Sequence, residues 1–359
     1  MPEEHAETPV ALVVGATGIA GSALIERATD LGWDVYGLAR RIPSQVSYRP
    51  VQADLGEPAG LAESLSNIRP THVFYTSWAK MPTEAQNCLV NGAMIRNLFT
   101  ALRPQGSVRH AALMTGLKHY LGPFEAYGQG PVPDTPFHED EPRLPVQNFY
   151  YDQEDELFSA AKQGGFTWSV HRSHTVIGYA LGNAMNMGLT LAAAASICQA
   201  SGRPFVFPGS EMQWNGLTDM TDSRLLAKQM IWAARDAGAA DTAFNIVNGD
   251  VFRWRWLWPR LAEYFNVKWE GFQDRPRPLE QQMADAEPIW RQIAADKGLI
   301  EPDIGRVASW WHTDGDLGRA MECITDMARS RRLGFTDQIP TEDAFHQLFD
   351  RYREMQIIP

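Results

Sequence analysis

Short apolar runs alternate with helical patterns through the first part of the chain. The runs of strand length are residues 10–14, 34–38, 48–52, 71–76 and 109–115. The stretches between them with apolar residues at helical spacing are residues 22–31, 60–67 and 87–102. Strands that are apolar on both faces belong to parallel sheets whose two faces are covered by helices. The pattern therefore predicts an α/β fold with a doubly wound parallel sheet.

The pattern becomes mostly helical beyond about residue 178. Residues 184–200 and 223–237 are helical stretches, residues 242–247 form a strand that returns to the sheet, and the region from Trp254 onward is rich in tryptophan. We therefore expect a sheet domain over residues 1–178, joined by the strand near 242–250, and a smaller, mostly helical substrate lobe over residues 179–359. A substrate would bind in the cleft between the two lobes.

Composition narrows the class of protein. Hydrophobic residues make up 44% of the 359 residues and include 12 tryptophans, enough for a substantial core. The net charge of −11 argues against nucleic acid or an anionic membrane as the main partner. The few, widely spaced cysteines and an acidic N-terminus, unlike the basic start of a signal peptide, indicate a cytoplasmic protein. The apolar stretch 10–23 is too short to span a membrane.

A glycine pattern follows the first predicted strand. Gly15, Gly18 and Gly21 are spaced Gly-x-x-Gly-x-x-Gly and open the first predicted helix. In such loops the first glycine makes the tight turn, the second lets the backbone approach a pyrophosphate, and the helix N-terminus faces that anion. The strand–turn–helix context therefore predicts a dinucleotide site on a Rossmann fold.

The end of the second predicted strand indicates which dinucleotide binds. NAD-binding folds usually place an acidic residue there for the ribose 2′-hydroxyl, but this strand ends in Arg40 and Arg41. Two guanidinium groups can bind a 2′-phosphate instead, so the pattern favours NADP(H). Asp54 and Leu55 follow the third predicted strand, where the usual adenine contact lies.

The candidate tyrosine and lysine are arranged unusually. Tyr150 and Tyr151 open a predicted helix, and Lys118 precedes them at the end of the strand 109–115. Ordinary short-chain dehydrogenases carry Tyr-x-x-x-Lys within one helix, but the positions four after the tyrosines are Glu154 and Asp155. Adjacent helical residues point about 100° apart, so one tyrosine can face a cleft while the other packs in the core.

Together these motifs resemble the progesterone 5β-reductase/iridoid synthase-like (PRISE) family of atypical extended short-chain dehydrogenases. The resemblance rests on Thr-Gly-x-Lys118-His119-Tyr120-x-Gly-Pro-Phe124-Glu125, on Asn148-Phe149-Tyr150-Tyr151-x-x-Glu154-Asp155, on the glycine loop and on Phe74-Tyr75-Thr76-Ser77-Trp78-Ala79. It covers most of the chain. It implies NADPH-dependent reduction of the C=C bond of activated enones, with a small apolar, steroid- or terpenoid-like enone as the partner.

The resemblance also implies roles for individual residues. Lys118 and Tyr150 match the family's catalytic pair, and Trp78 and Phe124 match positions that line its substrate pocket. The implied cofactor contacts are Gly15, Thr17, Gly18, Ile19, Gly21, Arg40, Arg41, Asp54, Leu55, Thr76, Ser77, Thr115, Lys118, Tyr150 and Val176. One departure is Ser173, where the family commonly has proline.

Several interpretations stay open at this level. Met185, Met187, Trp310, Trp311 and Phe335 either line an apolar pocket or belong to the ordinary core. A carbonyl reductase and a nucleotide-sugar epimerase or dehydratase share the fold, and a regulator that senses NADP(H) is the non-enzyme alternative. The histidines show no metal-ligand spacing, so no metal site is predicted. A homodimer is the expected assembly because it is the commonest one.

Overall fold

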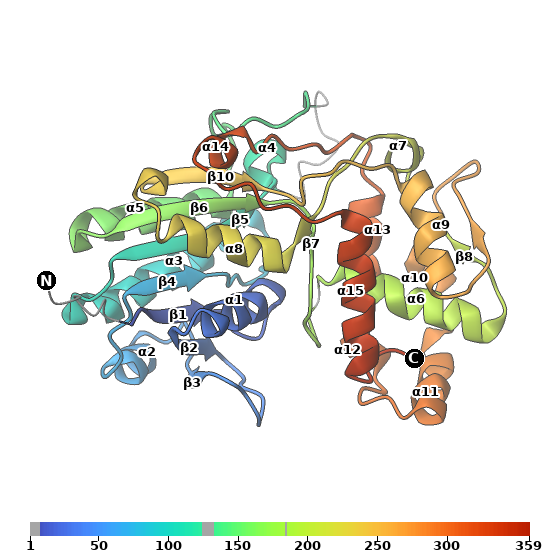
Figure 1. Cartoon of the computed structure of the whole chain (residues 1–359), viewed down its shortest axis with the longest axis horizontal. Coiled ribbons are helices and arrows are strands. Elements are labelled where there is room, and N and C mark those ends of the chain that lie inside the picture. The colour runs from blue at the N-terminus through green and yellow to red at the C-terminus, as the bar shows by residue number, and fades with distance from the viewer. Residues whose placement is uncertain (1–7, 124–132, 184) are drawn as a thin grey trace, which may run out of the picture.

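The computed structural model describes residues 8–123, 133–183 and 185–359 (Figure 1). Within this part of the chain the largest sheet has seven parallel strands in the order β10-β6-β5-β4-β1-β2-β3. Its strands are β1 (Val10–Val14), β2 (Asp34–Ala39), β3 (Arg49–Gln52), β4 (His72–Tyr75), β5 (His110–Gly116), β6 (Thr167–Ser173) and β10 (Thr242–Ile246). The strand order reverses between β1 and β4, and doubly wound sheets bind ligands at such a switch point.

Helices cover both faces of this sheet (Figure 1). α1 (Ile19–Asp30) and α8 (Ser223–Ala233) lie on one face, and α2 (Pro58–Leu65), α3 (Glu84–Leu102) and α5 (Phe149–Gly164) lie on the other. The predicted α/β class with a doubly wound parallel sheet is confirmed.

Strand β1 shows how the apolar pattern produces this arrangement. Ala11 and Val13 pack into the core under α1 and α8, whereas Leu12 and Val14 pack into the core under α2, α3 and α5. Successive side chains of a strand point to opposite faces. A central strand that is covered on both sides must therefore be apolar at every position.

The helical side of the molecule is built around buried tryptophans. Trp254, Trp258 and Trp290 are at most 2% exposed and share one core. The helices here are α6 (Met187–Ser201), α7 (Glu211–Asn215), α9 (Trp254–Tyr264), α10 (Leu279–Gln282), α11 (Ala286–Lys297), α12 (Ile304–Val307) and α13 (Trp310–Leu317). Two short parallel ladders join β8 (Phe205–Val206) to β11 (Trp269–Glu270) and β7 (Val176–Ile177) to β9 (Thr221–Asp222).

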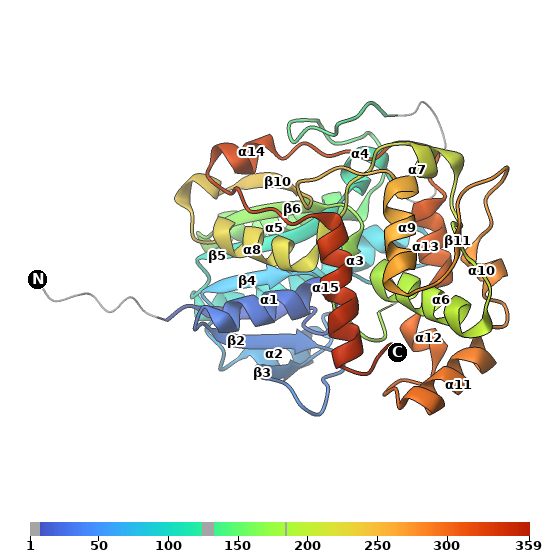
Figure 2. The same ribbon diagram turned by 45° about the vertical axis from the view of Figure 1, so that its right-hand side comes forward.

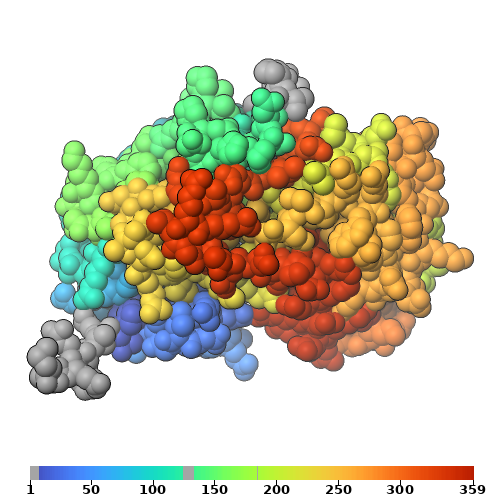
Figure 3. Space-filling view, turned by 45° about the horizontal axis from the view of Figure 1, so that its top comes forward, coloured from blue at the N-terminus to red at the C-terminus, as the bar shows by residue number. Residues whose placement is uncertain are grey.

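The last helix connects the two sides. α15 (Thr341–Glu354) packs on α6 and α9 and stands between those helices and α1 in Figure 2. Arg351 Nη1 on α15 donates to Glu26 Oε2 on α1 at 3.0 Å. Figure 3 shows the C-terminal part of the chain, in red, crossing one face of the molecule after α14 (Ala328–Arg332). None of the helices in the described part of the chain combines the length and apolarity needed to cross a bilayer.

Three local differences separate the predicted elements from the structure. The helix expected over 223–237 ends at Ala233, because Asp236 accepts from Gly238 N at 2.8 Å and starts a separate turn. The stretch 184–200 becomes helical only from Met187, after Asn186 caps it. Lys118 does not end a strand but begins the short helix α4 (Lys118–Leu121), just beyond β5.

Candidate active site

The loop between β1 and α1 is shaped by its glycines. Gly15 has φ +91°, and a Cβ there would lie 2.8 Å from both Ser77 Oγ and Thr76 Oγ1. A Cβ on Gly21 would collide with the Gly15 carbonyl oxygen. Gly18 is the N-cap of α1, and no side chain caps the helix there. The amides of this helix start are therefore available to an anion such as a pyrophosphate.

A cavity of about 750 Å³ lies at the carboxyl ends of β1, β2 and β4. It is the crevice beside the switch point of the sheet, where dinucleotides bind in this class of fold. Arg40, at the end of β2, lines it. Asp54, after β3, lines it too, and its Oδ1 is fixed by accepting from Gly56 N at 2.8 Å. The residues present therefore fit a dinucleotide.

A second cavity of about 200 Å³ adjoins the first. The two share Gly18, Thr76 and Trp78 in their walls. The smaller cavity extends over the end of β5, and both Lys118 and Tyr150 line it. A molecule in the larger cavity can therefore extend into the cavity that Lys118 and Tyr150 line.

Most of the residues predicted from the sequence lie in these two walls. The larger cavity is lined by Gly15, Thr17, Gly18, Arg40, Asp54, Leu55, Thr76, Ser77 and Trp78. The smaller cavity is lined by Gly18, Ile19, Thr76, Trp78, Lys118, Tyr150 and Val176. Among the predicted residues that the structure describes, Gly21, Arg41 and Thr115 line neither cavity. Phe124 lies outside the described residues.

The adjacent tyrosines face different surroundings. Tyr150 lines the smaller cavity, and its hydroxyl lies 3.4 Å from where a Cβ on Gly116 would be. Tyr151 is buried, and its hydroxyl donates to the His119 carbonyl at 2.8 Å and accepts from Leu144 N at 3.0 Å. Tyr150 thus faces the cavity while Tyr151 packs in the core, as two adjacent positions on a helix allow.

Asn148 links the lysine to the tyrosine. It is the N-cap of α5, and its Oδ1 accepts from Tyr150 N at 3.1 Å. Its Nδ2 donates to the Lys118 carbonyl at 2.7 Å. One amide side chain therefore sets the position of α4 relative to the start of α5.

Lys118 is held in a buried environment. Its Nζ lies 3.8 Å from Glu84 Oε2 and 4.7 Å from the centre of the Phe149 ring. Glu84 also accepts from Phe149 N at 2.9 Å and from Asn87 Nδ2 at 2.8 Å. The sequence analysis did not single out Glu84, because an acidic residue in the first turn of a helix is an ordinary feature.

Tyr150, which lies near Lys118 and Glu84, keeps its phenol proton. Burial, and then the Glu84 carboxylate, raise the pKa of Tyr150 above its usual value. The phenol is therefore neutral over the physiological range and can act as a hydrogen-bond donor. Lys118 lines the same cavity as Tyr150.

Aromatic and sulfur-containing residues divide between the cavities and the core. Trp78 stacks on Phe149 with ring centres 5.3 Å apart, and Met185 lines both cavities. Trp311 lines the larger cavity. By contrast, Met187 and Phe335 are buried in the hydrophobic cores, and Trp310 packs against one of them.

One further stretch of the smaller cavity's wall is polar. It contains His174, next to the end of β6, together with His312 and Asp316 of α13 and Arg319 beyond it. The sequence analysis gave none of these four residues a role. Among the described residues, no group of His, Cys, Asp or Glu side chains is arranged to hold a metal ion. His312, Asp316 and Arg319 are spaced by four and three residues. This spacing places side chains on one face of a helix, so it could have shown that the three residues lie together.

The fold, the glycine loop and the cavity walls define a dinucleotide-binding protein of the extended short-chain dehydrogenase type. A family model described as the PRISE-like Rossmann-fold domain matches residues 50–359. The chain belongs to this family, as the motifs indicated, and is an oxidoreductase.

Named relatives cover nearly the whole chain. A 3-oxo-Δ(4,5)-steroid 5β-reductase of Arabidopsis thaliana is 39% identical over 363 residues, which are 98% of this chain and 93% of the relative. An (S)-8-oxocitronellyl enol synthase of Camptotheca acuminata is 39% identical over 365 residues, with shares of 98% and 93%. An (S)-8-oxocitronellyl enol synthase of Catharanthus roseus is 36% identical over 365 residues, with shares of 98% and 92%.

Solved structures agree on the fold. A UDP-glucose 4-epimerase of Thermotoga maritima with UDP-glucose superposes with a TM-score of 0.67 at 14% identity, over 96% of this chain and 99% of that one. A UDP-glucose 4-epimerase of Thermus thermophilus in complex with NAD gives a TM-score of 0.66 at 16% identity, again over 96% and 99%. At such identities the likeness concerns the fold alone.

Proposed function

We propose that this protein is an NADPH-dependent reductase of the carbon–carbon double bond of activated enones. The observation that carries the proposal is the meeting of Tyr150 and Lys118 in one small cavity, from the separate helices α5 and α4. The cavity adjoins the glycine loop, so both side chains lie next to the proposed cofactor site. The names of the relatives, a steroid 5β-reductase and enol synthases, support the same reaction class.

The chemistry places a requirement on Tyr150. Reduced nicotinamide, when bound, supplies a hydride to the β-carbon of the enone. Negative charge then grows on the carbonyl oxygen, so a donor aimed at that oxygen lowers the barrier, typically by about 3–4 kcal/mol. The neutral phenol of Tyr150 is the donor that this cavity offers.

Lys118 contributes without being a proton source. Its ammonium group lies in the same wall as Tyr150 and adds positive potential near the enolate oxygen and the nicotinamide ribose. An enolate can be protonated later at carbon, so Tyr150 need not transfer its proton completely. A carbonyl reduction must protonate an alkoxide and favours the close Tyr-x-x-x-Lys arrangement, which this helix lacks.

The cofactor preference is proposed from the end of β2. Arg40 lines the larger cavity at that position, and Leu38 and Ala39 before it carry no acidic group for a ribose 2′-hydroxyl. A guanidinium group can form paired hydrogen bonds with a phosphate. We therefore expect NADPH to bind better than NADH.

The experiment that tests this function is an NADPH-oxidation assay with product analysis. The panel contains cyclic and acyclic enones, enals and the matched saturated ketones. Oxidation with the enones, giving the saturated carbonyl compound, is the expected result. Consumption only with saturated ketones would identify a carbonyl reductase instead, and turnover of a UDP-sugar without net NADPH consumption would identify an epimerase.

A further inference from the structure

One stretch of the smaller cavity consists of polar residues to which the proposed reaction gives no role. His312, Asp316 and Arg319 line it, and their side chains are 11%, 8% and 9% exposed. Buried polar groups in a binding cavity need hydrogen-bond partners, because leaving them desolvated and unsatisfied is costly. A ligand that enters this cavity must therefore offer hydrogen-bond partners to these three side chains.

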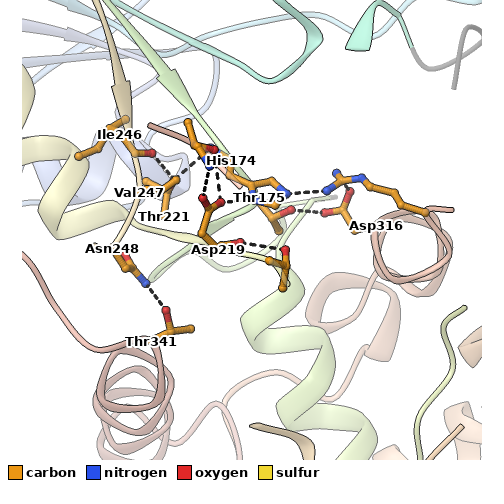
Figure 4. A network of polar contacts seen from close by, with 12 residues as sticks. His174, Thr175, Asp219, Thr221, Ile246, Val247, Asn248, Asp316 and Thr341 are labelled. Carbon is orange, nitrogen blue, oxygen red and sulfur yellow. Dashed lines mark hydrogen bonds and ion pairs between the residues drawn. The ribbon is translucent and has the colours of Figure 1, made fainter. Parts of the chain in front are cut away.

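Asp316, labelled in Figure 4, and Arg319 are both held by hydrogen bonds. Arg319 Nη1 donates to His174 Nε2 at 2.6 Å, and Nη2 donates to Asp316 Oδ1. The other carboxylate oxygen, Asp316 Oδ2, accepts from Thr175 Oγ1 at 2.8 Å. The wall is thus attached at two points to the segment that follows β6.

His174 is itself oriented from behind. Its Nδ1 donates to Asp219 Oδ1 at 2.7 Å, as Figure 4 shows, and Asp219 Oδ2 accepts from Thr325 N at 2.7 Å. Burial lowers the pKa of His174, but the bond to Asp219 outweighs burial and raises that pKa to about 9. The bond that Arg319 donates to Nε2 nevertheless requires the ring to carry its proton on Nδ1. The chain of bonds from Asp219 through His174 therefore fixes the guanidinium group of Arg319.

His312 completes the wall with unused hydrogen-bonding capacity. Its Nε2 lies 3.7 Å from Asp316 Oδ2, beyond hydrogen-bonding distance. Burial lowers the pKa of His312, so its ring is neutral at neutral pH. Burial opposes the ionisation of Asp316, but the charge of Arg319 outweighs it and lowers the pKa of this carboxyl. The wall thus presents an ionised carboxylate as acceptor beside guanidinium and imidazole groups.

This combination selects among ligand groups. A carboxylate on the ligand would be repelled by the ionised Asp316. An ammonium group would be repelled by the guanidinium group of Arg319. An alkyl group would leave the wall desolvated. A hydroxyl group both donates and accepts, so it can donate to Asp316 while accepting from His312 or Arg319.

We propose that the wall of His312, Asp316 and Arg319 binds a hydroxyl group of the enone substrate, remote from the carbonyl oxygen that Tyr150 binds. The proposal rests on the proposed function and narrows its substrate class from apolar enones to hydroxylated ones. It makes His312 a specificity-determining residue.

The test compares straight-chain 2-enals with their ω-hydroxy counterparts over a series of chain lengths. Wild-type enzyme should show a higher kcat/KM for the hydroxylated member at one favoured length, mainly through a lower KM. In His312→Leu the ratio of hydroxylated to unsubstituted kcat/KM should fall about tenfold, the size of one hydrogen bond. His312→Gln, which keeps a donor and an acceptor, should restore part of that ratio.

His138→Leu is the matched control, because His138 is 54% exposed and lines neither cavity. Its ratio should equal that of wild type. Wild-type enzyme that prefers the unsubstituted enal at every length overturns the proposal, even if His312→Leu does not fold. A loss in His312→Leu that is equal for both substrates and follows the KM for NADPH also overturns it, since the wall then serves the cofactor. Absence of NADPH oxidation with every enone and enal of the panel would instead contradict the proposed function.

Discussion

Glu84 Oε2 lies 3.8 Å from Lys118 Nζ, in a site where both side chains are less than a tenth exposed. The other oxygen of the same carboxylate, Oε1, accepts from Phe149 N, the first residue of the helix that carries Tyr150. One buried carboxylate on α3 therefore binds the lysine and positions the start of α5. The Tyr150–Lys118 arrangement depends on a third residue that belongs to neither motif.

Replacing Glu84 by Gln should move the alkaline limb of the pH–rate profile to lower pH. The carboxylate raises the pKa of Tyr150, in addition to burial, so removing its charge lowers that pKa. The phenol donor is then lost at a lower pH than in wild type. The measurement is kcat against pH, together with phenolate absorbance from difference spectra against Tyr150→Phe.

The control for that experiment is Glu156→Gln. Glu156 also lies next to α3, where it pairs with Arg96, but it lines neither cavity. Its profile should match that of wild type. A Glu84→Gln profile that also matches wild type would mean that the Glu84 carboxylate does not raise the pKa of Tyr150.

Tyr150→Phe should lower kcat by about two to three orders of magnitude, the usual effect of losing one donor to a developing oxyanion. Tyr151→Phe removes the bonds to the His119 carbonyl and from Leu144 N. It should cost about 1 kcal/mol of stability and leave the turnover of the folded protein within a few-fold of wild type. Steady-state kinetics and urea unfolding of both variants decide the matter, and a larger kcat loss in Tyr151→Phe would mean that the tyrosines were assigned the wrong way round.

The elements and the nucleotide loop could be predicted because their signals are local. The run Val10–Val14 and the Gly15, Gly18 and Gly21 spacing each encode a conformation through neighbouring residues alone. Strand β6 received no range of its own in the sequence analysis. Its residues Ser169, His171 and Arg172 are buried yet polar, and each has a partner on another element, namely His110, Gln229 and Tyr120.

The site residues show the same division. Tyr150 and Lys118 were named from their motifs, and their catalytic roles stay predictions. The contact of Lys118 with Glu84 and the bond from Arg319 to His174 join segments far apart in the sequence. Such contacts depend on tertiary packing, which spacing along one chain does not reveal.

Arg40→Ala should raise the KM for NADPH by about ten- to a hundredfold, which corresponds to the loss of a charge-assisted hydrogen bond. The KM for NADH should change much less, because NADH has no 2′-phosphate. Arg41→Ala should have a smaller effect, since Arg41 does not line the larger cavity in the described part of the chain. Initial rates with both cofactors for both variants test this. An equal rise in the KM for NADPH and for NADH would mean that Arg40 does not bind the 2′-phosphate.

Gly15→Ala should abolish cofactor binding and lower stability. The φ of +91° is unfavourable for alanine, and the new methyl would lie 2.8 Å from Ser77 Oγ and Thr76 Oγ1. Gly60→Ala is the control, because Gly60 lies in α2 and a Cβ there meets nothing within 4 Å. That variant should gain up to about 1 kcal/mol from helix propensity. Thermal unfolding with and without NADPH compares the two, and an NADPH-dependent stabilisation of Gly15→Ala equal to that of wild type would contradict the proposed site.

A chain of buried hydrogen bonds links β5, β6 and α8. His171 Nδ1 donates to Gln229 Oε1 at 2.8 Å, so its Nε2 accepts from Ser169 Oγ at 2.8 Å. Ser169 Oγ in turn accepts from His110 Nε2 at 2.9 Å. Each ring therefore carries a single proton in this chain, and a second proton on His171 Nε2 would leave the Ser169 hydroxyl proton without its acceptor.

Acid should weaken the fold through these two histidines. Burial lowers the pKa of His171 from 6.5 to about 4, and burial and His171 lower the pKa of His110 from 6.5 to about 3. Below pH 6.5 the unfolded chain takes up protons that the folded chain excludes, so the free energy of unfolding falls by up to about 1.4 kcal/mol per pH unit for each histidine. Urea unfolding between pH 7 and pH 5 should show this decline in wild type. In His171→Gln the free energy of unfolding should fall less steeply with decreasing pH, by up to about 1.4 kcal/mol per pH unit, whatever the variant's stability at pH 7. An unchanged slope would mean that His171 is already protonated in the folded protein.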